Sequence, residues 1–199
     1  MYIVIEGIDG AGTTTQTGML ATYLFNKSKD AMVLTTREPT MHTDAGLEIR
    51  RRLKQNEPLP LQQWADLFIK DRTYHLERIV QPAMNKGVHV LSDRNMLSTL
   101  AYQSNSEDDI QFLYDKHQYL LQPDILIYLD VPPHVALQRM DRELDMFETQ
   151  LDRVSKNYVA ACTLYNATII DGTQSIDDVH KSIVNIVEEY KNMKKGVTQ

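Results

Sequence analysis

The sequence predicts an α/β fold in which a five-stranded, mainly parallel sheet carries helices on both faces. Short runs rich in Val, Ile and Leu alternate with longer segments of helical periodicity, an alternation typical of parallel sheets. A glycine-rich turn follows the first run directly. At 199 residues, with 42% hydrophobic and 24% charged residues, the chain has the size of one domain. We therefore expect residues 1–199 to form a single domain.

The expected strands are short and mostly apolar, as in a sheet whose two faces are both covered. Glycine, polar or charged residues bound each run, which fixes the approximate ends. We expect strands at residues 2–6, 32–36, 88–92, 125–130 and 168–170.

Helical periodicity fills the segments between these strands. In the last segment apolar residues recur every three or four positions, which indicates one face packed on the core. Residues 191–199 are expected to fray as a tail. We expect helices at residues 14–26, 45–55, 61–85, 97–103, 107–121, 133–142, 147–165 and 176–193.

The turn after the first strand has the spacing of a phosphate-binding loop. Gly7 and Gly12 match the glycines of the pattern G-x-x-x-x-G-K-[ST], Thr14 takes its hydroxyl position, and Thr13 stands where the pattern has lysine. Backbone N–H groups and the positive end of a helix dipole make such a turn a site for polyphosphate. Taken alone, an ordinary strand-to-helix turn also explains it. The residues of the loop are Gly7, Ile8, Asp9, Gly10, Ala11, Gly12, Thr13, Thr14 and Thr15.

Composition limits the kinds of partner and metal. The net charge of -6 argues against a protein that coats nucleic acid or an anionic membrane, so we expect small phosphorylated substrates. The single cysteine, Cys162, excludes an internal disulfide and a cysteine-based zinc site, and the six histidines lack metal-ligand spacing. Because the sequence contains no leader-like segment and no apolar stretch of about 20 residues, we expect a cytoplasmic protein.

Charged residues follow the expected strands. Asp9 lies in the loop after the first strand, Arg37 follows the second, and Asp93 and Arg94 follow the third. The carboxyl ends of parallel strands meet at one edge of the sheet, where ligands collect. Each doublet taken singly is explained by a surface ion pair. Their recurrence beside a phosphate-binding loop favours a site of phosphoryl transfer, which requires cations and magnesium.

The long helix expected at 61–85 offers a second set of side chains. Phe68 and Arg72 are four residues apart and so share one face. An aromatic ring beside a guanidinium suits a base and its monophosphate. The alternative is a packed core aromatic next to a solvated arginine.

A dense run of charges covers residues 139–145, after Pro132 and Pro133. Such runs are usually solvated faces. The alternative is a short lid, at about residues 139–148, that brings Arg139 and Arg142 over the transferring phosphoryl group and excludes water.

Taken together and in order, these residues resemble the thymidylate kinases, of the P-loop nucleoside monophosphate kinase superfamily. The resemblance covers essentially the whole chain. Its motifs are Ile5-Glu6-Gly7-Ile8-Asp9-Gly10-Ala11-Gly12, Thr36-Arg37-Glu38-Pro39, Leu67-Phe68 with Arg72, Ser92-Asp93-Arg94 followed by Leu97-Ser98-Thr99-Leu100-Ala101-Tyr102-Gln103, and Pro123-Asp124 with Tyr128-Leu129-Asp130-Val131.

The resemblance implies transfer of the γ-phosphoryl group of ATP to dTMP, giving dTDP and ADP in dTTP synthesis, with Mg²⁺ and commonly in a homodimer. For the acceptor, it implies that Phe68 stacks on thymine while Arg72 and Gln103 address the polar edge of the base. Tyr102 would lie under the deoxyribose and disfavour a 2′-hydroxyl.

For the phosphates and the metal, the resemblance implies that Arg37 and Arg94 hold the acceptor phosphate, with Asp9 near the sugar and the acceptor. Thr14 and Asp93 would organise magnesium, directly or through water. The resemblance thus implies a catalytic set of Asp93, Arg94, Arg139 and Arg142.

Departures from the family pattern bear on catalysis. One branch carries an arginine at the position of Gly10, whereas the other supplies arginines from the lid, which favours Arg139 and Arg142 here. The lid of that second branch usually contains Leu-Asp-Arg, but this chain reads Leu-Asp-Met at residues 144–146, so the exact lid assignment stays open.

The substitution at Thr13 leaves the loop without the lysine that neutralises charge on the transferring group. Two alternatives therefore stay open beside a thymidylate kinase: a kinase of another nucleotide or nucleoside acceptor, and a nucleotide-binding protein without catalysis. Residues 171–174 border the donor base in one interpretation and form a helix-capping turn in the other.

Overall fold

One parallel sheet forms the centre of the computed structural model, which describes residues 1–140 and 150–197. Its strands stand in the order β2-β3-β1-β4-β5, and every neighbouring pair runs parallel. The predicted α/β fold is confirmed, with each strand end within one residue of its expected place. The strands are β1 Tyr2–Gly7, β2 Val33–Arg37, β3 His89–Asp93, β4 Ile125–Asp130 and β5 Thr168–Asp171.

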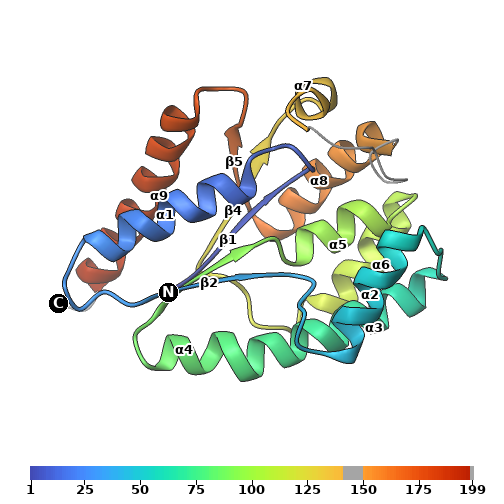
Figure 1. The fold of residues 1–199 in the computed structure, drawn as a ribbon, viewed down its shortest axis with the longest axis horizontal. Coiled ribbons are helices and arrows are strands. Elements are labelled where there is room, and N and C mark those ends of the chain that lie inside the picture. The colour runs from blue at the N-terminus through green and yellow to red at the C-terminus, as the bar shows by residue number, and fades with distance from the viewer. Residues whose placement is uncertain (141–149, 198–199) are drawn as a thin grey trace.

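Helices cover both faces of the sheet (Figure 1). On one face α1 packs beside α9, and on the other α5 packs beside α8, with α3 and α6 against α5. The helical elements are α1 Thr13–Asn26, α2 Asp44–Gln55, α3 Leu61–His75, the π-helical turn η1 Leu76–Val80, α4 Gln81–Asn85, α5 Met96–Gln103, α6 Glu107–His117, α7 Pro133–Gln138, α8 Leu151–Tyr165 and α9 Ile176–Val197.

The central strand explains why this arrangement is stable. Every residue of β1 is buried, including Tyr2 at its start and Glu6 near its end. A strand flanked by two others and covered on both faces buries apolar side chains in both directions, so it reads as a continuous apolar run. Because β1 lies in the middle of the sheet, the loop that follows it opens at the centre of the carboxyl edge.

Three helix ends differ from their predicted places. α6 ends at His117 instead of 121, because Leu120 N–H bonds the His117 carbonyl in a tight turn ahead of Pro123. α7 ends at Gln138 instead of 142. The Arg139 N–H donates to the Ala136 carbonyl, three residues earlier, which forms a tight turn at the end of the helix. α9 runs to Val197, beyond the expected end at 193 and into the expected tail of 191–199, because no proline stops it and lysines in its last turn favour its dipole.

Two expected segments lie partly outside the described residues. The helix predicted at 147–165 corresponds to α8 from Leu151 onward, and most of the lid predicted at 139–148 falls in the gap between 140 and 150. Across the two described stretches, no helix combines the length and the apolar character that crossing a bilayer requires.

Candidate active site

A cleft of about 700 Å³ opens at the carboxyl edge of the sheet. The loop after β1, the ends of β2 and β3, one face of α3 and the far end of α5 all contribute to its lining, as expected for a parallel sheet. The structure brings together sixteen of the predicted site residues here: Ile8, Asp9, Gly10, Ala11, Gly12, Thr13, Thr14, Thr15, Arg37, Phe68, Arg72, Asp93, Arg94, Tyr102, Gln103 and Arg139. Gly7, the last residue of β1, is buried and is not part of this lining, and Arg142 is outside the described residues.

The loop is held in a conformation that requires its glycines. Gly10 and Gly12 have φ of +82° and +96°, and the Ala11 N–H bonds the Ile8 carbonyl at 3.0 Å. A Cβ on Gly10 would come within 2.3 Å of the Ala136 carbonyl oxygen in α7. The loop therefore packs directly on α7, and at this position there is no room for a side chain.

Thr13 occupies the first position of α1 and is 6% exposed. Its side chain brings a hydroxyl but no charge to the loop. Among the described residues that line the cleft, the cations are arginines: Arg37, Arg50, Arg72, Arg94 and Arg139. Any positive charge that the described part of the chain offers to a polyphosphate therefore comes from outside the loop.

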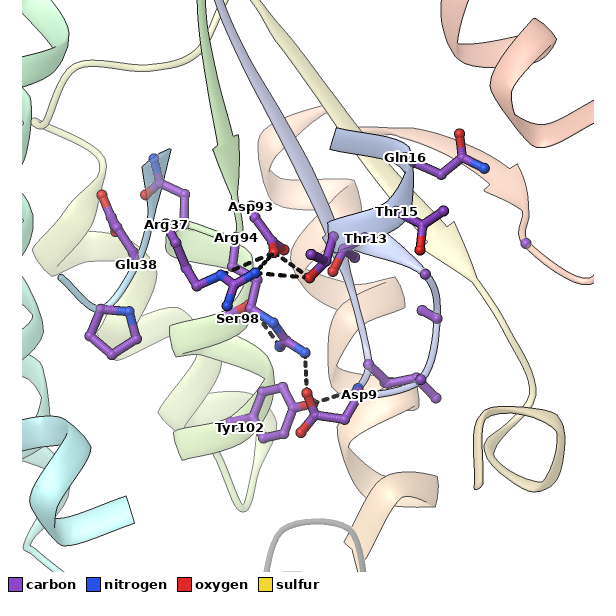
Figure 2. A pocket seen from close by; sticks show the side chains of 18 of the residues that line it. Asp9, Thr13, Thr15, Gln16, Arg37, Glu38, Asp93, Arg94, Ser98 and Tyr102 are labelled. Carbon is purple, nitrogen blue, oxygen red and sulfur yellow. Dashed lines mark hydrogen bonds and ion pairs between the residues drawn. The ribbon is translucent and has the colours of Figure 1, made fainter. Parts of the chain in front are cut away.

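Arg37 and Asp93, at the ends of β2 and β3, lie beside the loop (Figure 2) and contact it at Thr14. The Thr14 hydroxyl donates to Asp93 Oδ2 at 2.6 Å, and Arg37 Nη2 donates both to that oxygen, at 2.7 Å, and to Thr14 Oγ1, at 3.0 Å. Asp93 Oδ1 is buried and has no hydrogen-bond partner among the described residues. A hydroxyl beside a carboxylate with a free oxygen is the hard donor set that Mg²⁺ accepts when phosphates complete its shell, so these residues fit the metal.

No larger metal site occurs in the part of the chain that the structure describes, where no three His, Cys, Asp or Glu side chains are grouped to hold an ion.

A second charged contact joins the loop to the segment after β3. Arg94 Nη2 donates to Asp9 Oδ1 at 2.5 Å, and its guanidinium lies 5.4 Å from the centre of the Tyr102 ring. The Asp9 N–H in turn donates to the Tyr102 hydroxyl at 3.1 Å (Figure 2). Burial raises the pKa of Tyr102 to about 12, which keeps this phenol neutral near pH 7. Asp9, Arg94 and Tyr102 thus form one corner of the cleft.

A buried polar cluster beneath this corner was missed by sequence reasoning. Glu6 accepts from the Asn95 N–H at 2.8 Å and from the Ser98 hydroxyl at 2.5 Å, while the Tyr158 hydroxyl donates to the Gly7 carbonyl at 3.0 Å. Burial raises the pKa of Glu6. The one signal in the sequence was a carboxylate, Glu6, inside an otherwise apolar strand. Tyr158 gave no signal of its own.

The far end of the cleft combines an aromatic ring with a buried arginine. Phe68 lies 5.9 Å from the ring of Trp64, and Arg72 is only 2% exposed. Arg72 Nε donates to Glu38 Oε2 at 2.6 Å and Nη2 to Thr99 Oγ1 at 2.9 Å. Arg72 is therefore not solvated. Its partners Glu38 and Thr99 also line the cleft, and the spacing of α3 alone does not reveal them.

At the opposite end, Arg139 Nη2 donates to the Gly172 carbonyl at 3.0 Å. Gly172, Gln174 and Ile176 line the cleft here. The Asp171 carboxylate accepts from the N–H and hydroxyl of Thr173, as in a turn before a helix. Both interpretations of residues 171–174 are thus compatible with the geometry.

Comparison with known proteins gives a consistent result. The family model described as thymidylate kinase matches residues 5–183. A thymidylate kinase of Thermosipho africanus is 37% identical over 202 residues, covering 96% of this chain and 98% of its own. A thymidylate kinase of Francisella philomiragia is 34% identical over 205 residues, covering 95% and 98%, and a probable thymidylate kinase of Thermococcus gammatolerans is 32% identical over 203 residues, covering 95% and 96%.

Proposed function

Because the chain belongs to the thymidylate kinase family, it is an ATP-dependent kinase that phosphorylates dTMP, and we propose how the residues of its cleft carry out this reaction. The observation that supports the proposal most directly is the meeting of Thr14, Arg37 and Asp93 at the mouth of the loop. A hydroxyl, a cation and a carboxylate from three successive strand ends are what in-line phosphoryl transfer between two anionic substrates requires.

We propose that dTMP occupies the side of the cleft between α3 and the Asp9 corner. Phe68 stacks on the base, and Arg72 and Gln103 address its polar edge. Tyr102 lies under the deoxyribose, with Asp9 close to the sugar. The burial of Arg72 and the fixed contact between Asp9 and Tyr102 support this orientation, because both groups are held before any ligand arrives.

The acceptor phosphate is held by Arg37 and Arg94 in this proposal. Arg37 has 52% of its side chain exposed and reaches toward the loop, whereas Arg94 is 18% exposed and anchored on Asp9. Two guanidinium groups offset the repulsion between the acceptor phosphate and the polyphosphate of ATP.

ATP binds by its phosphates to the backbone of residues 7–15 in our proposal. Thr14 and Asp93 hold Mg²⁺, which when bound neutralises charge on the phosphate oxygens. An oxygen of the dTMP phosphate forms the new bond to the γ-phosphorus as the bond to the β,γ-bridging oxygen breaks, leaving ADP. Asp93 and Arg94 keep the two substrates aligned.

The charge that a loop lysine would supply comes from arginines outside the loop, in our proposal. Arg139 lies at the donor end of the cleft, and Arg142 follows three residues later in the expected lid. The bond from Arg37 to Thr14 supports this view, since it brings a guanidinium to the residue next to Thr13. We further propose a cytoplasmic homodimer, as family members commonly form.

Coupled ADP release with Mg-ATP and a panel of dTMP, dUMP, dGMP and thymidine tests the function. We expect the highest kcat/KM with dTMP and only background release without an acceptor. A higher value for another acceptor would mean a different kinase, and binding of ATP and dTMP without turnover would mean that Thr13 marks a loss of catalysis.

A further inference from the structure

We infer that His75 is a positioning residue which acts through Glu38 on Arg72, and so makes the acceptor site select a pyrimidine with an oxygen at C4. The inference rests on the proposed function, in which Arg72 faces the polar edge of the base. His75 itself is fully buried in α3 and does not line the cleft.

The three side chains form one continuous chain of short contacts. His75 Nδ1 lies 2.7 Å from Glu38 Oε1, and the other oxygen of that carboxylate accepts from Arg72 Nε at 2.6 Å. On the far side of the imidazole, Nε2 lies 2.8 Å from the Thr36 hydroxyl. Glu38 is 4% exposed and His75 is 0% exposed, so water does not compete for these bonds.

The hydrogen-bond inventory assigns the protons. With Nδ1 protonated, His75 donates to the Glu38 carboxylate, and its Nε2 accepts from the Thr36 hydroxyl. Each group then has a complementary partner. The imidazole fixes the carboxylate by one oxygen while the arginine takes the other, which leaves the carboxylate no freedom to rotate.

The guanidinium of Arg72 is thereby fixed on two sides. Nε is bound to Glu38 and Nη2 to Thr99, whereas Nη1 is buried and has no partner among the described residues. A buried donor without a partner costs free energy, and because Arg72 lines the cleft, an acceptor on a bound ligand can complete its bonding. A carbonyl oxygen at C4 supplies that acceptor, and an amino group at the same carbon does not.

The segment that carries Glu38 is anchored independently of His75. Asp71 accepts from the Thr40 N–H at 2.7 Å and from the Thr43 hydroxyl at 2.5 Å. Loss of the imidazole therefore frees the Glu38 carboxylate, and with it the guanidinium, without releasing the backbone around residues 38–43. That separation is what makes the positioning role testable.

The test compares dissociation constants of dTMP and 4-thio-dTMP by calorimetry, without ATP. The two nucleotides differ only at the C4 substituent, and sulfur is a weak acceptor. We expect the unmodified protein to bind dTMP about tenfold more tightly, the effect of one hydrogen bond from a charged donor. In His75→Leu the ratio of the dissociation constant of 4-thio-dTMP to that of dTMP should fall to about one, mainly because the affinity for dTMP is lost.

A conservative variant and a matched control separate positioning from general damage. His75→Asn keeps a donor close to the place of Nδ1 and should restore most of the preference. His117→Gln changes another fully buried histidine, one outside the lining of the cleft, and should leave the ratio at its original value. Thr36→Val removes only the hydroxyl beside Nε2 and should lower the ratio about threefold.

A ratio in His75→Leu equal to that of the unmodified protein would overturn the inference, and an unchanged ratio in Thr36→Val would do so if His75→Leu does not fold. Failure of the unmodified protein to bind dTMP would instead refute the proposed acceptor site, so the two failures are distinguishable.

Discussion

Arg37 and Asp93 are register partners on neighbouring strands, and Arg37 Nη2 donates to Asp93 Oδ2 at 2.7 Å. The pair stands where β2 and β3 end, and the same carboxylate oxygen accepts from the Thr14 hydroxyl of the loop. Sheet register thus brings a cation from one strand end, a carboxylate from the next and a hydroxyl from the phosphate loop within contact of one another.

Asp93→Asn tests this arrangement. The amide keeps the size of the side chain but removes its charge. We therefore expect kcat to fall about 10²-fold and the Mg²⁺ concentration that gives half-maximal activity to rise. Magnesium titrations of ADP release measure both. Asp130→Asn, at the end of β4 and outside the lining of the cleft, is the matched control. Equal magnesium dependence in the two variants would contradict a metal role for Asp93.

Arg142→Ala tests whether an arginine compensates for Thr13. We expect a loss in kcat of about 10²-fold, because a positive charge at the transferring group is removed. In a Thr13→Lys background the same substitution should lower kcat by a smaller factor, since the new ammonium supplies part of that positive charge. Steady-state rates of the four proteins give the coupling, with Arg78→Ala, at an exposed position of η1, as a control. Equal losses in both backgrounds would argue against compensation.

Gly10→Ala should damage the loop and loosen its contact with α7. The new Cβ would lie 2.3 Å from the Ala136 carbonyl oxygen, on a residue with a φ of +82°. We therefore expect the free energy of unfolding to fall by about 2 kcal/mol or more. Gly18→Ala, at an exposed position of α1 where nothing lies within 4 Å of the added atom, should raise the free energy of unfolding by about 0.5–1 kcal/mol. Thermal unfolding distinguishes the two, and similar midpoints for both variants would refute the close packing of the loop.

His117 should make the protein less stable in mild acid. Burial lowers the pKa of His117 from 6.5 to about 3, and the positive charge of Arg72 lowers it further, while the hydrogen bond from Nδ1 to the Leu113 carbonyl opposes the shift. The folded state therefore binds fewer protons than the unfolded chain below pH 6.5. The resulting stability is complete above pH 6.5 and is lost as the pH falls toward 3.

Urea unfolding at pH 7 and pH 5 measures this effect. Between pH 7 and pH 5, the free energy of unfolding should fall by about 2 kcal/mol more in the unmodified protein than in His117→Gln. The contributions of all other titrating groups are the same in both proteins and cancel in this difference. A parallel decline in the two proteins would mean that His117 does not titrate in this way.

The sheet was predictable because each strand carries its own signal. Runs such as residues 2–6 are apolar in both directions, and the turn residues that bound them are local. The face shared by Phe68 and Arg72 followed from helical spacing, and both residues line the cleft. Local periodicity decided these features, so no knowledge of distant partners was needed.

The buried polar partners were not predictable in the same way. Glu38 and His75 are 37 residues apart, and Glu6 and Tyr158 are 152 apart. Nothing in the spacing of either pair indicates a contact, because only the packing of α3 against the end of β2, or of α8 under β1, brings them together. Helix ends such as His117 depended likewise on a turn that periodicity does not encode.

The most direct measurement of the central claim is ³¹P NMR of the protein with equimolar Mg-ATP and dTMP. The account predicts that the γ-phosphorus signal of ATP is replaced by the β-phosphorus signal of dTDP, with ADP in equal amount and little inorganic phosphate. Unchanged ATP in the presence of dTMP, or conversion to inorganic phosphate without dTDP, would contradict phosphoryl transfer in this cleft.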